Sequence, residues 1–171
     1  MDMGSADNIT LIGMPGSGKS TLGRALADRL GYEFVDGDEI IRSMGGALQH
    51  IIDSHGEKRF LEIEEAALLS LGGKGKVFSP GGSCVLSSAA MNHLRSISVV
   101  LFLDVAYANL VKRLSLDGVE LRGIVGLKEL GLQEVYKKRR PLYLKYAHVV
   151  VRLEDRPIRE NVELLLARIL P

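Results

Sequence analysis

Several features that mark whole classes of protein are scarce in this chain of 171 residues. It has one cysteine, Cys84, which excludes an internal disulfide framework and a cysteine-rich metal site. No apolar run approaches the roughly 18 residues that a membrane-spanning helix needs. The first eight residues lack the basic stretch and apolar segment of a secretory signal. We therefore predict a protein of the reducing cytoplasm that does not associate with membranes.

An excess of charge of one sign is also missing. The chain has 22 Lys and Arg residues against 21 Asp and Glu residues, for a net charge of +1. Proteins that coat nucleic acid carry a strong positive excess, so the balance argues against a nucleic-acid partner. The length suits one compact domain better than two. We predict a single domain over residues 1–171, acting as a monomer on a small molecule.

The order of the apolar runs predicts the fold class. Five short β-rich runs alternate with longer stretches in which apolar residues recur at helical spacing. Such alternation implies right-handed crossovers and a mostly parallel sheet covered on both faces. We therefore predict a three-layer α/β fold with helix breaks near Gly45-Gly46, Gly56 and Pro141. The expected strands are 8–13, 33–36, 76–79, 97–104 and 148–153, and the expected helices are 19–30, 39–55, 57–71, 87–95, 106–114, 128–146 and 157–170.

Residues Gly13–Ser20 (GMPGSGKS) fit the phosphate-loop pattern G-x-x-x-x-G-K-[ST], between an expected strand and an expected helix. Glycines let the backbone curl around one anion, and the helix N-terminus adds partial positive charge. Lys19 can reach the β and γ phosphates, and Ser20 can place its hydroxyl on Mg²⁺. The plainer alternative is a glycine-rich turn without a ligand. We predict nucleotide binding at Gly16, Ser17, Gly18, Lys19, Ser20 and Thr21.

Asp36 and Asp38 end the second expected strand, in the sequence FVDGD. Side chains two apart on a strand share a face, so both carboxylates can point into one crevice. A kinase acting on an alcohol needs one carboxylate near the metal and another to orient or deprotonate the hydroxyl. We assign Asp36 to the metal's outer shell and Asp38 to the acceptor hydroxyl. Asp38 could also simply cap the helix expected near Glu39.

A second glycine turn, Ser79–Ser83, follows the third expected strand. Paired glycines let a ligand approach the backbone closely, and they fit a tight turn without a ligand equally well. Since no aspartate ends this strand, Asp104 at the end of the fourth strand is a weaker alternative partner for the metal. Cys84, beside the turn, is expected to be a small buried residue.

Two groups of basic residues remain. Arg113 precedes the segment 116–126, which we predict to be a lid loop, and Arg122 lies within it. An arginine there can neutralise charge on a transferred phosphoryl group, or it can be a solvated surface residue. The run KKRR at 137–140 fits a solvated helix face, a weak nucleic-acid patch, or a site for an anionic substrate that a guanidinium group would bind.

Together these segments resemble the shikimate kinase family, among the phosphate-loop kinases, over nearly the whole chain. The motifs GMPGSGKST, LADRLGYEFVDGDEII, HGEKRF, VFSPGGS, the Arg122 loop and RRPLYLKYA follow the family's order. The resemblance implies transfer of the γ-phosphoryl group of ATP to a hydroxyl of shikimate, with Mg²⁺. By this resemblance Lys19, Asp38 and Arg122 are catalytic, Ser20 and Asp36 serve the metal, Asp38, Gly81, Gly82 and Arg139 bind the acceptor, and Arg113 and Arg156 lie near the adenine.

The chain departs from the family's pattern on the acceptor side. The family's second carboxylate-binding arginine, in G-E-x-x-F-R, is Leu61 here, its third glycine is Ser83, and its lid sequence Arg-Pro-Leu-Leu reads RGIV at 122–125. Losing one charge-assisted pair costs roughly 1.5–3 kcal/mol, about ten- to a hundredfold in affinity, unless Lys58 compensates. Homoserine and gluconate therefore stay open as alternative acceptors, and a non-catalytic nucleotide-binding descendant is the alternative from another class.

Overall fold

The computed structural model describes residues 7–46, 48–116 and 123–169. The described chain forms one five-stranded sheet in the order β2-β3-β1-β4-β5, and its four strand pairings are all parallel. This confirms the predicted α/β fold with a mostly parallel sheet. The strands are β1 (Asn8–Ile12), β2 (Glu33–Asp36), β3 (Lys76–Ser79), β4 (Val99–Val105) and β5 (Val149–Leu153).

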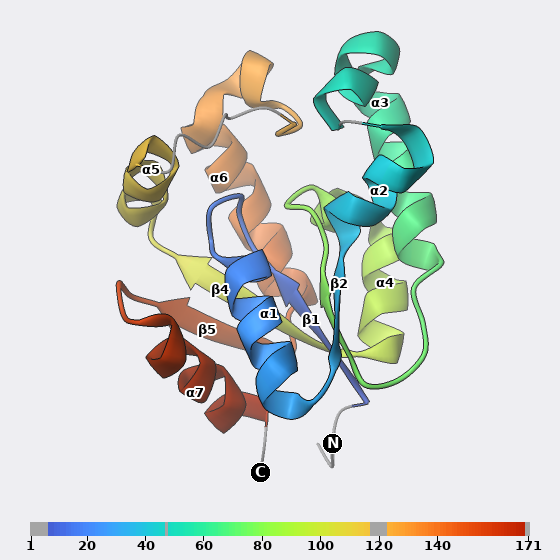
Figure 1. Cartoon of the computed structure of the whole chain (residues 1–171). Coiled ribbons are helices and arrows are strands. Elements are labelled where there is room, and N and C mark those ends of the chain that lie inside the picture. The colour runs from blue at the N-terminus through green and yellow to red at the C-terminus, as the bar shows by residue number, and fades with distance from the viewer. Residues whose placement is uncertain (1–6, 47, 117–122, 170–171) are drawn as a thin grey trace.

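Helices cover both faces of the sheet, which gives the three layers (Figure 1). Helices α1 and α7 lie together on one face, and α4 and α6 cover the other. Every residue of β1 is buried, as expected for a central parallel strand with both faces covered. The helices are α1 (Lys19–Leu30), α2 (Gly37–Gly45), α3 (Leu48–Leu69), α4 (Ser88–Ile97), α5 (Tyr107–Leu116), α6 (Leu127–Tyr146) and α7 (Ile158–Ile169), with a 3₁₀ turn at Cys84–Leu86.

Two of the three expected helix breaks occur where glycine predicts them. Gly46 (φ 90°) separates α2 from α3, and Gly56 (φ 80°) interrupts α3. The break expected at Pro141 is wrong, because α6 continues through this residue and is interrupted at Gly131 (φ 74°) instead. Buried side chains on both sides of Pro141, Arg139 and Tyr143, hold the helix in place despite the missing backbone donor.

Helix α2 begins at Gly37, two residues earlier than expected. Asp36 is its N-cap, and Asp36 Oδ1 accepts a hydrogen bond from the backbone N–H of Asp38 at 3.0 Å. The alternative in which Asp38 caps this helix is therefore wrong. Since Asp36 provides the cap, the Asp38 carboxylate is left for other contacts.

The carboxyl ends of the strands place the predicted motifs at one edge of the sheet. The register pairs Asp36 at the end of β2 with Ser79 at the end of β3. The phosphate loop follows β1, the next strand in the sheet. Ligands of such folds bind in the crevice beyond these ends. Within the described residues, no helix is long and apolar enough to span a membrane.

Candidate active site

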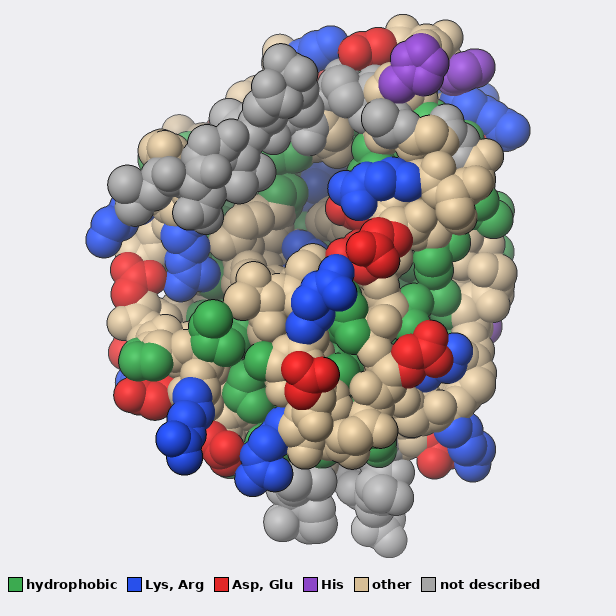
Figure 2. Space-filling view, in the orientation of Figure 1, with side chains coloured by type: hydrophobic (Ala, Val, Ile, Leu, Met, Phe, Trp, Pro, Cys, Tyr) green, Lys and Arg blue, Asp and Glu red, His purple; other side chains and the backbone are tan. Residues whose placement is uncertain are grey.

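A cavity of about 700 Å³ opens beyond the carboxyl ends of the central strands. The phosphate loop and the loop after β3 form its floor, and α2, α3 and α6 contribute its walls. Helices α2 and α3 lie on one side of this end of the sheet and α6 on the other (Figure 1). Figure 2 shows the hollow between them, with Lys and Arg side chains inside it and at its rim. One cavity thus brings together segments more than a hundred residues apart in sequence.

The phosphate loop has the backbone that an anion cradle requires. Gly16 (φ 78°) and Gly18 (φ 91°) adopt left-handed conformations that favour glycine, and Gly18 is the N-cap of α1. The N-terminal N–H groups of α1 therefore point toward the cavity. Ser17 is buried, and its hydroxyl finds no hydrogen-bond partner within the described chain. Five of the six loop residues predicted to bind the nucleotide line the cavity, namely Gly16, Gly18, Lys19, Ser20 and Thr21, whereas Ser17 is not among its lining residues.

Lys19 is folded back onto its own loop. Its ammonium donates hydrogen bonds to the carbonyl oxygens of Gly13 (2.9 Å) and Met14 (3.1 Å). Burial lowers the pKa of Lys19, while the neighbouring Asp38 and Asp36 carboxylates oppose that shift. A phosphate in the loop would supply the negative charge that this buried ammonium lacks.

Ser20 and Asp36 provide oxygen ligands side by side. The Ser20 hydroxyl lies 3.4 Å from Asp36 Oδ2, although the two residues come from different elements. Asp36 Oδ2 also lies 3.9 Å from Arg24 on α1. A hydroxyl and a carboxylate beside a phosphate loop fit a hard divalent cation such as Mg²⁺, which prefers oxygen and keeps several waters.

Asp38 faces the cavity from the first turn of α2. Burial raises the pKa of its carboxyl group, Lys19 and Arg42 oppose the shift, and Asp36 adds to it. A raised pKa makes this carboxylate a stronger hydrogen-bond acceptor and base than an exposed aspartate. Asp38 is thus suited to align, or to accept a proton from, a hydroxyl in the cavity.

Gly81 and Gly82 lie where a Cβ atom would come too close to neighbouring groups. A Cβ on Gly81 would lie 2.6 Å from Glu64 Oε1 and 3.1 Å from Asp38 Oδ1. A Cβ on Gly82 would lie 2.8 Å from Pro15 Cδ. The Gly82 carbonyl accepts a hydrogen bond from the Tyr143 hydroxyl at 2.6 Å, which fixes the turn against α6. Glycine is needed here because the site is crowded from three sides.

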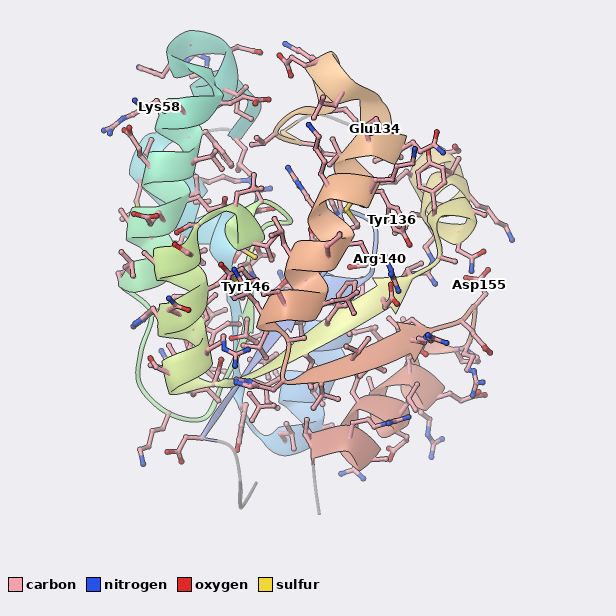
Figure 3. All side chains as sticks on the ribbon, turned by 180° about the vertical axis from the view of Figure 1, so that it is seen from behind. Lys58, Glu134, Tyr136, Arg140, Tyr146 and Asp155 are labelled. Atoms are coloured by element: carbon pink, nitrogen blue, oxygen red, sulfur yellow. The ribbon has the colours of Figure 1, made fainter. Side chains whose placement is uncertain are left out.

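Arg139 lies across the cavity from α2. Only 3% of the residue is exposed, and its Nη2 donates to the Val125 carbonyl at 2.8 Å. Its Nη1 comes within 3.4 Å of a Cβ built on Gly82, so this nitrogen borders the glycine turn. The neighbouring Arg140 points elsewhere and makes two hydrogen bonds to Asp104, at 3.0 and 2.8 Å (Figure 3).

These contacts decide between the alternatives for the basic run and for Asp104. Arg139 is buried and Arg140 is ion-paired, while Lys137 pairs with Glu134 on the same helix. The run therefore does not form a continuous basic patch of the kind that nucleic-acid binding favours. Asp104 is held by Arg140 and does not line the cavity, so nothing in the structure favours it as the metal's alternative partner. Cys84 is fully buried, as predicted.

Other predicted residues lie away from the cavity or outside the described chain. Arg122 and the rest of 117–122 fall outside the described residues. Arg113 donates to Asp155 at 3.0 Å, which brings α5 beside the loop that carries Arg156. Their roles at the adenine stay predictions. Lys58 and Leu61 line a smaller cavity of about 200 Å³ on α3.

Two residues of the site were missed by the sequence analysis. Glu64 on α3 is 2% exposed and lies between the smaller cavity and Gly81, and burial raises its pKa to about 7. Arg42 on α2 lines the main cavity. Its position four residues after Asp38 was the available signal, because such residues share a helix face. Glu64 offered no comparable signal.

Comparison with known proteins agrees with this arrangement. The family model described as shikimate kinase matches residues 15–170. A shikimate kinase from Colwellia psychrerythraea is 34% identical over 98% of this chain and 99% of its own length. One from Actinobacillus succinogenes is 36% identical over 90% of this chain and 89% of its own length.

A solved structure, shikimate kinase from Acinetobacter baumannii in complex with shikimate, has a TM-score of 0.85 and 29% identity. The alignment covers 97% of this chain and 94% of that one. A gluconokinase from Sinorhizobium meliloti, at 18% identity and a TM-score of 0.58, shares the fold. The chain belongs to the shikimate kinase family.

Proposed function

We propose that this enzyme transfers the γ-phosphoryl group of ATP to a hydroxyl of shikimate, giving ADP and shikimate 3-phosphate. The observation that carries the proposal is that Lys19, Asp38 and Arg139 line one cavity. The three side chains are matched to a phosphate, a hydroxyl and a carboxylate in turn. A shikimate molecule presents the last two of these groups to a kinase.

The residues divide the work by position. Lys19 turns from the carbonyls of Gly13 and Met14 to the β and γ phosphates and stabilises the charge that develops during transfer. Asp38 holds the acceptor hydroxyl in line with the phosphorus atom and takes up its proton. Arg139 binds the acceptor carboxylate while its bond to Val125 fixes the guanidinium plane. Arg122, as the lid arginine, would add a second cation at the transferred group.

Ser20 and Asp36 would hold Mg²⁺, Ser20 directly and Asp36 through water. Bound there, the ion would neutralise charge on the β and γ phosphates. Asp36 is fixed for this purpose by its own cap hydrogen bond to the Asp38 N–H. The cap therefore couples the metal's carboxylate to the residue that holds the acceptor.

The test is acceptor-dependent ADP release with ATP and Mg²⁺. Shikimate and homoserine are compared, and gluconate is the control. Saturable turnover with shikimate supports the proposal. Turnover with homoserine alone would replace the acceptor but keep the kinase, and ATP binding without any acceptor-stimulated ADP release would favour a non-catalytic descendant.

Gluconate is the less favoured second acceptor. The gluconokinase neighbour shares the fold at 18% identity, whereas the shikimate kinase relatives match at 34 to 36% across nearly their whole length. A longer open-chain polyol would also have to fit between Phe60 and Arg139 in the same 700 Å³ cavity. Control reactions with gluconate should therefore give only background ADP.

A further inference from the structure

Arg42 lies on α2, one helical turn after Asp38, and lines the cavity that Arg139 enters from α6. Residues four apart on a helix lie on one face, so the face that presents Asp38 also presents Arg42. Helices α2 and α6 stand on opposite sides of the hollow (Figure 1). Two guanidinium groups therefore reach the cavity from two separate walls.

Arg42 has no anion of its own. Its side chain makes no hydrogen bond or ion pair within the ranges that the structure describes, although its charge acts on the nearby Asp38 carboxylate. Other arginines nearby are paired: Arg24 with Asp36 and Glu39, and Arg59 with Glu62. A guanidinium group with all its donors open at a cavity wall is suited to an anionic ligand.

Arg139 cannot satisfy a carboxylate completely. Its Nη2 is committed to the Val125 carbonyl, and the residue is 3% exposed. A carboxylate offers two oxygens with about four lone-pair sites. Leu61 adds no donor, and it lines the smaller cavity rather than this one. Lys58 lies on α3 beside that same smaller cavity (Figure 3).

We propose that Arg42 is the second cation of the acceptor site, and that with Arg139 it selects hydroxylated acceptors that carry a carboxylate. One face of α2 then carries both groups that contact the acceptor, with Asp38 binding the hydroxyl and Arg42 binding the carboxylate. This inference rests on the proposed function, because shikimate is the acceptor used in its first test.

The experiment compares Arg42→Ala with Arg59→Ala, a matched exposed arginine on α3 that pairs with Glu62 outside the main cavity. Steady-state kinetics are measured with shikimate and with its methyl ester, which keeps the hydroxyls and lacks the charge. We expect Arg42→Ala to raise KM for shikimate about ten- to a hundredfold, with KM for ATP within twofold of wild type. For the ester, KM should rise less than threefold in Arg42→Ala. For shikimate, the KM of Arg42→Lys should lie between those of wild type and Arg42→Ala.

The outcomes separate the inference from the proposed function. Equal KM values for shikimate in Arg42→Ala and Arg59→Ala, in an active enzyme, would overturn the role of Arg42 alone. Equal losses for acid and ester would also overturn it, because Arg42 would then act on the hydroxyls or on Asp38. If wild type ignores shikimate but phosphorylates another hydroxy acid, the proposed acceptor fails, and the same acid–ester comparison on that substrate decides Arg42.

Discussion

The two halves of the cavity are assembled in different ways. The nucleotide half comes from one continuous segment, Gly13–Thr21, whose glycines and lysine carry the anion site in their own sequence. The acceptor half comes from four separate places: α2, α3, the turn after β3, and α6. A continuous loop forms its binding geometry once the strand and helix beside it form. A site built from distant segments forms only when the whole domain folds.

The difference also concerns tolerance to change. Every position of the phosphate-loop pattern is present, while Leu61 and Ser83 depart from the family's pattern on the acceptor side. A loop that binds through backbone N–H groups has few alternatives. A carboxylate can be held by an arginine arriving from any wall, so Arg42 on α2 can take over what α3 does not provide.

Removing the lysine of the nucleotide half should have the largest effect. Lys19→Ala is expected to lower kcat by at least about 10²–10³-fold with every acceptor, because the charge developing on the phosphoryl group loses its preorganised cation. ADP release measures this. Lys74→Ala is the control, since Lys74 is exposed and pairs with Asp7. Activity of Lys19→Ala within a few-fold of wild type would disprove the phosphate-loop assignment.

Filling the glycine turn should break the acceptor half next most strongly. In Gly81→Ala the new methyl would lie 2.6 Å from Glu64 Oε1 and 3.1 Å from Asp38 Oδ1, so the carboxylates must shift. We expect kcat/KM for shikimate to fall about a hundredfold, in line with misplaced catalytic groups, with KM for ATP little changed. Gly72→Ala, with open space around its Cβ, is the control. Equal kinetics in the two variants would mean that the turn does not border the acceptor.

Burial of Glu64 should make the acceptor half sensitive to pH. Its pKa is raised to about 7 from 4.5, chiefly by burial, so the folded protein binds this proton more tightly than the unfolded chain. The contribution of this proton to the free energy of unfolding is therefore complete below about pH 4.5. It falls by about 3 kcal/mol as the pH rises to 7. Urea unfolding should show Glu64→Gln gaining stability relative to wild type between pH 5 and 8, whereas the exposed Glu62→Gln should show no such trend.

An arginine at position 61 should have the smallest effect in the wild-type background. With Arg42 present, we expect Leu61→Arg to improve kcat/KM for shikimate only a few-fold, and with Arg42→Ala at least tenfold. Leu61 is partly buried against the cluster of Ile41, Ile51, Phe60, Ala67 and Val125, so thermal unfolding must accompany the kinetics. A large gain in kcat/KM in both backgrounds would show that Arg42 does not bind the carboxylate.

Sequence patterns predicted the local parts of the molecule well. The strand and helix order, the breaks at Gly46 and Gly56, and the phosphate loop follow from periodicity and glycine placement within short windows. Pro141 misled because burial of Arg139 and Tyr143 outweighs its local cost, a balance set by packing partners far along the chain. The helix cap was assigned to Asp38 as an alternative, whereas the structure places it at Asp36. Two aspartates flank Gly37, and only the backbone conformation decides which of them caps the helix.

By itself, the sequence determined the parallel α/β architecture, the nucleotide loop and Asp38 as a chemical candidate, while Arg139 was singled out from the basic run only by the resemblance to the family. It could do so because strand and helix periods and a phosphate-binding turn are properties of neighbouring residues. The tertiary structure alone decided that Arg139 enters the cavity while Arg140 turns to Asp104, that Glu64 is buried against Gly81, and that Arg42 lines the main cavity while Lys58 lines the smaller one. Those outcomes depend on which surfaces meet when α2, α3 and α6 pack around the ends of the strands, and no local window contains that information.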